Sequence, residues 1–184
     1  MHDPNPSFTG PASTGYDAAD KWSPVPDWST AAIDRDGWTA RPRPGLFRLH
    51  LAGQIDLAIA ELAPGAPMSG LWEIAAHDPA VLCIGRDRAL IVSEKPLPAI
   101  HGWNVKGWAA TPADDAWLAF DIEGPDLRTL MARAVTVDLE TGSPSAMLNF
   151  AGVPALLVRT APATARITVE AGLAAYVWRW LEGA

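Results

Sequence analysis

The chain carries few residues whose types and spacing could form a catalytic or metal-binding site. Its four histidines, His2, His50, His77 and His101, are far apart, and none lies in a short pattern with cysteine or carboxylate ligands. The sequence also lacks the glycine-rich motifs that hold nucleotide phosphates and the G-x-S-x-G motif of serine hydrolases. We therefore expect no catalytic, cofactor-binding or metal-binding residue in this chain.

The acidic segments are explained more simply as turns and loops. Residues 34–37 (Asp-Arg-Asp-Gly) match part of a calcium loop, but the third acidic ligand and the closing glutamate are missing. Asp114 and Asp115 are adjacent, so they point to opposite sides of an extended chain. Asp121 and Glu123 share one face near the end of an expected strand, but no partner residue is evident for acid-base chemistry.

Composition predicts a folded protein that does not bind nucleic acid. With 184 residues, 49% of them hydrophobic and 19% charged, the chain can bury a core large enough to offset its conformational entropy. The formal charge of −7 opposes binding to phosphate backbones. A single cysteine, Cys83, excludes an internal disulfide and is interpreted as a buried thiol. No secretory signal or long apolar run is visible, so we expect a cytoplasmic protein.

Hydrophobic periodicity divides the chain into an arm and a compact body. Residues 1–44 contain seven of the 17 prolines and show no period, which predicts an extended, irregular arm. Residues 45–184 form the body. Its first lobe, 45–98, is expected to contain two hairpins, one from strands at 47–51 and 55–59 and one from strands at 80–84 and 89–92.

The second lobe, residues 99–184, has the clearest pattern. Apolar residues alternate in the strands and recur at helical spacing in the helices, in the order strand, helix, three strands, helix. This order predicts an α+β fold with a mixed or antiparallel sheet, helices on one face, and a ferredoxin-like (split βαβ) second half. The expected strands are 116–122, 146–150, 153–160 and 166–169. The expected helices are 125–134 and a last helix that begins at Gly172 or Leu173 and ends at Glu182.

Nine tryptophans are the most informative residues for function. Tryptophan is a common anchor in protein interfaces, and a disordered arm would contain few aromatics. On the last helix Trp178 and Trp180 point about 200° apart. The spacing places Trp180 in the core and Trp178 outside. The candidates for a partner interface are Trp22, Trp28, Trp38, Trp103, Trp108 and Trp178, although packing on the chain's own body is the favoured explanation for the three in the arm.

Three segments resemble one known family. They are residues 108–139 (WAATPADDAWLAFDIEGPDLRTLMARAVTVDL), 82–92 (LCIGRDRALIV) and 174–181 (AAYVWRWL). They are similar to the aminomethyltransferase-like folate-binding fold shared by the glycine-cleavage aminomethyltransferase and sarcosine oxidase subunits, and most similar to the gamma subunit of heterotetrameric sarcosine oxidase. A relative used in iron–sulfur cluster maintenance has a Lys-Gly-Cys motif, but this chain has Trp108 after Lys106 and Gly107.

The resemblance implies a non-catalytic accessory subunit. Such a subunit docks on a large flavoprotein subunit that oxidises sarcosine or a related N-methyl amine and passes the one-carbon unit to tetrahydrofolate. The flavin, NAD and folate are then expected only in partner subunits. The alternative is a stand-alone folate-binding protein of one-carbon transfer, with Asp121, Glu123 or Asn149 as polar contacts. A self-associating structural protein is a third hypothesis.

Overall fold

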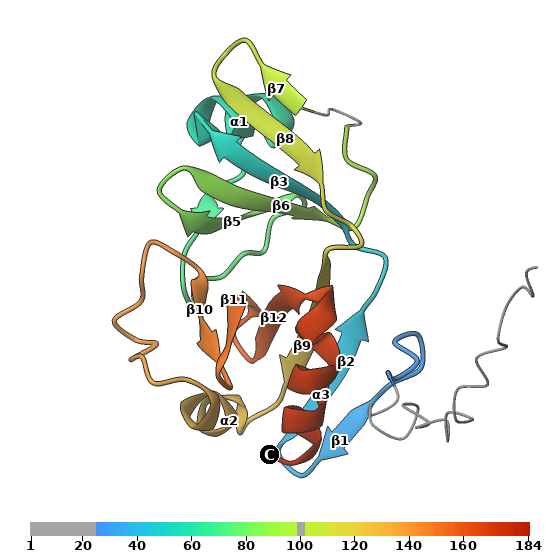
Figure 1. The fold of residues 1–184 in the computed structure, drawn as a ribbon. Coiled ribbons are helices and arrows are strands. Elements are labelled where there is room, and N and C mark those ends of the chain that lie inside the picture. The colour runs from blue at the N-terminus through green and yellow to red at the C-terminus, as the bar shows by residue number, and fades with distance from the viewer. Residues whose placement is uncertain (1–24, 99–101) are drawn as a thin grey trace, which may run out of the picture.

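Two six-stranded sheets form the body of the protein (Figure 1). The structure is a computed structural model and describes residues 25–98 and 102–184. The sheet nearer the top of Figure 1, here called the upper sheet, contains in spatial order β4 (Met68–Ser69), β5 (Ala80–Gly85), β6 (Arg88–Ser93), β3 (Phe47–Gly53), β8 (Trp108–Pro112) and β7 (Gly102–Asn104). The other, the lower sheet, contains β1 (Ile33–Arg35), β2 (Trp38–Arg43), β9 (Trp117–Glu123), β12 (Thr164–Glu170), β11 (Val153–Ala161) and β10 (Met147–Phe150).

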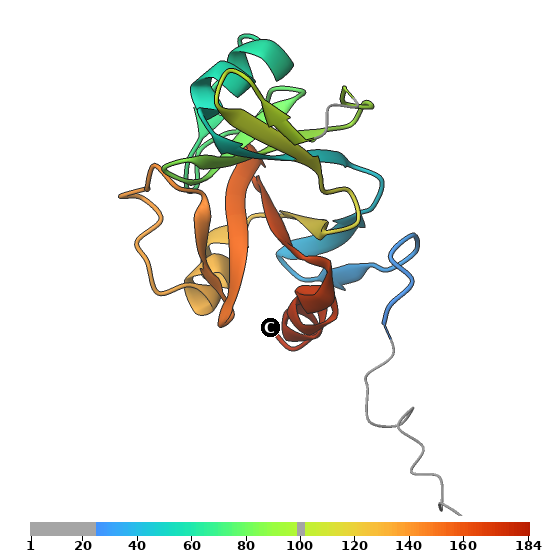
Figure 2. The same cartoon turned by 45° about the horizontal axis from the view of Figure 1, so that its top comes forward.

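Three α-helices within the described residues cover the outer faces of the sheets. Helix α1 (Ile55–Leu62) lies on the upper sheet, whereas α2 (Leu127–Ala134) and α3 (Ala174–Glu182) lie on the lower sheet (Figure 2). Each helix buries one stripe of apolar residues. In α2, for example, Leu127, Leu130, Met131 and Ala134 recur at the spacing of one helical face.

The layers enclose three apolar clusters. The first lies between the lower sheet and helices α2 and α3, and the second lies between the upper sheet and α1. The third lies between the two sheets and consists mainly of small and aliphatic side chains such as Ala119, Leu90 and Leu156. Strand β9 supplies two of these clusters, because Phe120 faces the helices while Ala119 faces the upper sheet.

The α+β class and the antiparallel pairing are confirmed. Among the strand pairs in the described residues, only β4 with β5 is parallel. The lower sheet departs from a split βαβ unit in one respect, because β12 lies between β9 and β11. The reason is the short turn between β11 and β12, which makes these two strands an antiparallel hairpin and so places β12 beside β11. Strand β10 therefore runs antiparallel to β9.

Two expectations for the first part of the chain are wrong. The residues expected as a strand at 55–59 form α1, because Ile55, Ala58 and Leu62 also fit a helical stripe. Residues 33–43 form β1 and β2 and do not belong to an irregular arm. Proline argued against a strand there, but β1 pairs only with the first half of β2, so Pro42 has a neighbour on one side alone.

The sheets also cross the expected boundary between lobes. Strands β7 and β8 follow residue 98 but complete the upper sheet, and β2 precedes residue 45 but pairs with β9 in the lower sheet. Each sheet therefore contains strands from both sides of the expected boundaries: the described chain begins in the lower sheet, passes to the upper sheet at β3 and returns to the lower sheet at β9.

Gly124, directly after β9, is expected to tolerate no side chain. Its φ is +146°, and a Cβ atom there would overlap the carbonyl oxygen of Gly37 and the Cα atom of Trp38. Gly124→Ala should lower the free energy of unfolding by about 3 kcal/mol, since backbone strain and a steric clash add together. Denaturant unfolding measures this loss.

Gly65→Ala is the matched control. Gly65 also has a positive φ, +81°, but a Cβ atom there meets nothing within 4 Å. Only the backbone cost of about 1 kcal/mol remains. Equal losses in the two variants would contradict the close approach of β2 to the end of β9.

Candidate functional site at the junction of the sheets

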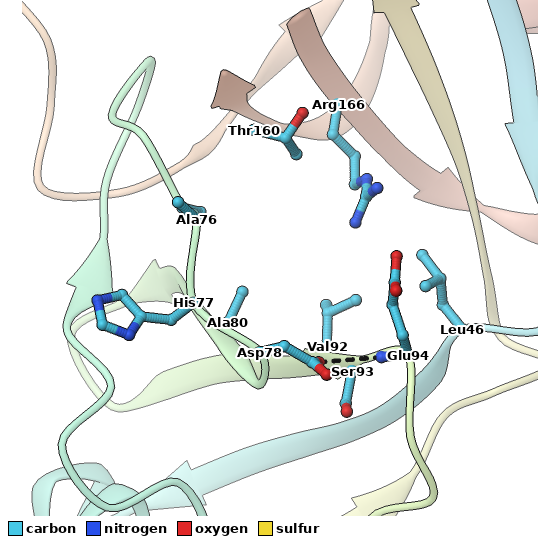
Figure 3. A pocket seen from close by; sticks show the side chains of 11 residues that line it. Leu46, Ala76, His77, Asp78, Ala80, Val92, Ser93, Glu94, Thr160 and Arg166 are labelled. Atoms are coloured by element: carbon cyan, nitrogen blue, oxygen red, sulfur yellow. Dashed lines mark hydrogen bonds between the residues drawn. The ribbon is translucent and has the colours of Figure 1, made fainter. Parts of the chain in front are cut away.

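A cleft of about 240 Å³ lies where the two sheets meet (Figure 3). We call it the junction cleft. Arg166 points from β12 toward Glu94 across it, and Asp78 accepts a hydrogen bond from the Glu94 amide at 3.0 Å. The other lining residues are Leu46, Ala75, Ala76, His77, Ala80, Val92, Ser93 and Thr160.

Four charged side chains form an alternating chain at the cleft. Arg43 of β2 donates to Glu94 at 2.5 Å and to Asp121 at 3.1 Å. Arg166 of β12 donates to the two oxygens of Asp121 at 2.6 and 2.8 Å. Because Glu94 follows β6 of the upper sheet and the other three lie in the lower sheet, this charge chain links the two sheets.

The geometry suits a structural role better than acid-base catalysis. Asp121 has a side chain only 16% exposed, and both its oxygens accept from guanidinium groups. A general base needs an oxygen within reach of a substrate proton, and here those oxygens are committed to arginine. The two arginines and two carboxylates of the charge chain also balance, so these four side chains together carry no net charge that could attract an ionic substrate.

Arg48 of β3 is a further cation between the sheets, and it is fully buried. It is 2% exposed, and its Nη1 atom donates to the carbonyl oxygens of Leu46 and Asp114. Within the part of the chain that the structure describes, its Nε and Nη2 atoms have no hydrogen-bond partner. Burial lowers the pKa of Arg48; Asp114 opposes this effect and Arg166 adds to it.

The pKa values of His50 and Cys83 are also shifted. Burial lowers the pKa of His50, and the nearby Arg88 lowers it further, so folding favours the neutral imidazole. Burial raises the pKa of the Cys83 thiol, which is 6% exposed and donates weakly to the Gly85 carbonyl. A protonated, buried thiol is a poor nucleophile, as expected from the apolar sequence around it.

The three polar residues named for a folate contact do not converge. Asp121 is occupied by arginines, and Glu123 is exposed at the end of β9 opposite Thr164. Asn149 is exposed on β10, and two strands lie between β9 and β10. At the usual strand spacing this separates Asn149 from β9 by about 14 Å.

The structure corrects three of the tryptophan candidates. Trp38, Trp108 and Trp178 are core residues, with exposed fractions of 7%, 0% and 2%. Trp108 faces α1 because it pairs with Asn104, one step out of phase with the pair of Trp103 and Ala109.

Trp178 is buried because the face of α3 (Ala174–Glu182) that packs on the lower sheet is rotated about the helix axis from the expected one. Its buried stripe is Ala174, Val177, Trp178 and Leu181, which leaves Trp180 at the rim against Phe150. The inner residue of the pair on the last helix is therefore Trp178 and the outer one is Trp180.

The remaining candidates differ in exposure. Trp28 is half-buried and lies edge-on to Phe120 and Trp178, with ring centroids 5.6 and 5.9 Å away. This contact docks the segment before β1 on the body. Trp103 is 72% exposed on the edge strand β7, and Trp22 lies outside the described residues.

Sequence reasoning missed the arginines of the junction cleft. Arg43, Arg48 and Arg166 are isolated in the sequence, and no local pattern marks them. Only the sheet pairing brings them together. Val105 was also missed, although a valine in a turn of Asn, Lys and Gly is itself unusual.

The described residues offer neither a membrane-spanning helix nor a cluster of metal ligands. None of the helices in these parts of the chain is long and apolar enough to cross a membrane. Residues 25–98 and 102–184 also contain no group of three or more histidine, cysteine or acidic side chains that could hold a metal ion.

Removal of the central carboxylate should loosen the junction of the sheets. Asp121→Asn leaves Arg43 and Arg166 without their shared anion, so we expect a loss of about 2 kcal/mol in the free energy of unfolding. Asp34→Asn is the control, because Asp34 pairs with Arg41 in an exposed ion pair worth about 0.5 kcal/mol or less. Denaturant unfolding at low and high salt would contradict the structural role if both variants lost equally little.

Comparison with known proteins identifies the fold. No protein-family model matches the chain, and neither does any curated protein. The structure is similar, with a TM-score of 0.65 and 22% sequence identity, to a chain of the heterotetrameric sarcosine oxidase from Corynebacterium sp. U-96 in complex with pyrrole 2-carboxylate. The match covers 81% of this chain and 84% of that chain, so the two are similar in length.

This likeness agrees with the resemblance in sequence, which points to the same complex. It is also consistent with the expected folate-binding type of fold, because the structural match covers most of both chains. The protein thus has the fold of a chain of heterotetrameric sarcosine oxidase.

Proposed function

We propose that this chain is a non-catalytic accessory subunit of an oxidase complex of the sarcosine oxidase type. The observation that carries the proposal is the match of fold to a chain of similar length that works inside a heterotetramer. A match confined to one domain of a large enzyme would carry less weight, since folds host many functions. Here most of each chain is matched.

The polar residues support this role. The charge chain at the junction cleft is balanced and holds the sheets together, and the residues named for a folate contact lie apart. The partner we propose is a larger flavoprotein oxidase subunit. The flavin, NAD and folate of the complex would belong to partner chains, and the reaction would be oxidation of an N-methyl amine in one-carbon metabolism in the cytoplasm.

We assign the docking surface to residues 103–107, which are the end of β7 and the turn that leads to β8, here called the hairpin tip. Its Trp103 and Val105 are 72% and 98% exposed, more than any other large hydrophobic side chain in the described residues. Large exposed apolar side chains are typical anchors of interfaces. The tip is remote from α2, which lies at the opposite end of the molecule (Figure 1).

The hairpin tip is held in place before any partner binds. Lys106 pairs with Glu61 of α1 at 2.7 Å, and its amide donates to the Asn104 side chain. The Gly107 carbonyl accepts from the amide of Gln54, which precedes α1. Because the backbone of the tip is already ordered, docking would cost less conformational entropy than ordering a free loop.

The alternative, a stand-alone folate-binding protein of one-carbon transfer, has weaker support. A folate site needs a few polar groups that converge on an apolar pocket. Asp121, Glu123 and Asn149 do not meet that requirement. Titration of the purified chain with tetrahydrofolate separates the two functions, since saturable binding would favour the alternative.

The double variant Trp103→Ser, Val105→Ser should weaken docking strongly. With the tagged protein expressed in its own host, we expect the unaltered chain to co-purify with a chain that shows the visible absorbance of flavin. Loss of two interface anchors should cost about 2 kcal/mol or more, so Kd should rise at least about thirtyfold. Quantitative pull-down of the purified flavoprotein measures the change.

Val137→Ser is the matched control, because Val137 is 46% exposed in the segment after α2 and lies outside the hairpin tip. It should leave the pull-down unchanged. Equal binding by the double variant would place the docking surface elsewhere. Recovery of the chain without any flavoprotein, or oxidation of sarcosine by the chain alone, would contradict the accessory role itself.

A further inference from the structure

A second pocket lies away from the junction cleft and the hairpin tip. It has a volume of about 600 Å³ and is lined by two segments, 71–73 and 139–144, together with Arg159 of β11. Strand β11 pairs with β10 only as far as Leu156. Farther along β11, residues 73–75 lie beside it: the Arg159 amide donates to the Glu73 carbonyl, and the Ala75 amide donates to the Arg159 carbonyl. We call it the Arg159 pocket.

The guanidinium of Arg159 is held on one side by a single residue, Trp72. Its Nε atom donates to the Trp72 carbonyl at 2.9 Å, and its Cζ atom lies 5.5 Å from the centre of the Trp72 ring. Among the described residues, Nη1 and Nη2 make no hydrogen bond or ion pair. The side chain is thus oriented by its Nε atom and ring face, while its two terminal nitrogens are left for another group.

Trp72 has an unusual backbone that makes this arrangement possible. Its φ is +64°, a value that a bulky residue rarely adopts and that costs about 1 kcal/mol or more. Two hydrogen bonds hold the turn, from the Trp72 amide to the Leu157 carbonyl and from the Leu71 amide to the Ser143 carbonyl. In this conformation the carbonyl and the indole of one residue both meet Arg159.

The acidic side chains of the pocket have other partners. Glu73 accepts from the Gly70 amide at 2.9 Å, and Glu140 pairs with Arg128 of α2. Neither forms an ion pair with Arg159 in the described structure. An arginine that keeps two parallel N–H donors matches the two oxygens of a carboxylate. Leu71, Leu139 and Pro144 provide apolar surface beside it.

We propose that the Arg159 pocket binds a carboxylate group that carries an apolar substituent. The group could come from a small organic acid or from the terminal carboxylate of another polypeptide, and both share the chemistry that Arg159 recognises. The site is separate from the proposed docking surface, so it does not rest on the proposed accessory function. It would add a ligand or peptide-binding activity to this chain.

The test is a titration followed by NMR of the full chain with its tryptophans labelled with ¹⁵N. The probes are benzoate, its neutral counterpart benzamide, and a short leucine-containing peptide with either a free or an amidated C-terminus. We expect saturable shifts at the Trp72 indole N–H with benzoate, with the free-acid peptide, or with both. Which of the two binds identifies the source of the carboxylate. Benzamide and the amidated peptide should give no saturable shift.

Variants assign the binding to the guanidinium. Arg159→Gln should weaken binding about tenfold or more, because a charged, bidentate partner is lost. Arg159→Lys keeps the charge but not the planar fork of donors, so its affinity for the carboxylate probe should lie between those of the unaltered chain and Arg159→Gln. Arg133→Gln, an exposed arginine of α2 outside the pocket lining, is the matched control and should bind like the unaltered chain.

Two results would overturn the proposal, and neither depends on the variants being folded. One is the absence of any saturable shift at Trp72 with both carboxylate probes. The other is an equal response to benzoate and benzamide, because the apolar wall and not the carboxylate would then account for binding. If Arg159→Gln unfolds, Arg159→Lys and the neutral probes still decide the outcome.

Discussion

Charge pairing across the two sheets is the constraint on which the rest of the molecule depends. The apolar cluster between the sheets consists of small and aliphatic side chains, which pack well but do not by themselves select one orientation of the sheets. The charge chain fixes this orientation, because each charged side chain must lie beside one of opposite charge. It consists of Glu94, Arg43, Asp121 and Arg166. Partly buried ion pairs of this kind favour one arrangement over its alternatives more than they add net stability.

That constraint also explains why the polar centre of the protein is a poor catalytic site. The groups with suitable chemistry lie at the junction, yet the sheet geometry uses both oxygens of Asp121 and both guanidinium groups to hold the layers together. The groups left for interaction lie at the periphery: an apolar hairpin tip on an ordered backbone, and an arginine stacked on tryptophan in a separate pocket.

Whether an element could be predicted depends on whether its sequence pattern lies within neighbouring residues. Strands β5, β6, β9, β11 and β12, and helices α2 and α3, were predictable within a few residues because their periodicity is local. Helix α1 was missed because Ile55, Leu57 and Ile59 alternate like a strand over a span too short to separate the two periods. Strand β2 was missed because Pro42 is acceptable only where one neighbouring strand has ended, which no local rule reveals.

The order of residues was sufficient for the α+β class, for most elements of the second half, and for the resemblance to a sarcosine oxidase subunit, since these depend on patterns within a dozen neighbouring positions. The tertiary structure alone decided which tryptophans are exposed, because one step of register puts Trp108 inside and Trp103 outside. It alone also brought Arg43 to Asp121 and Arg159 to Trp72. Those pairs are 78 and 87 residues apart, and only the folded chain places them in contact.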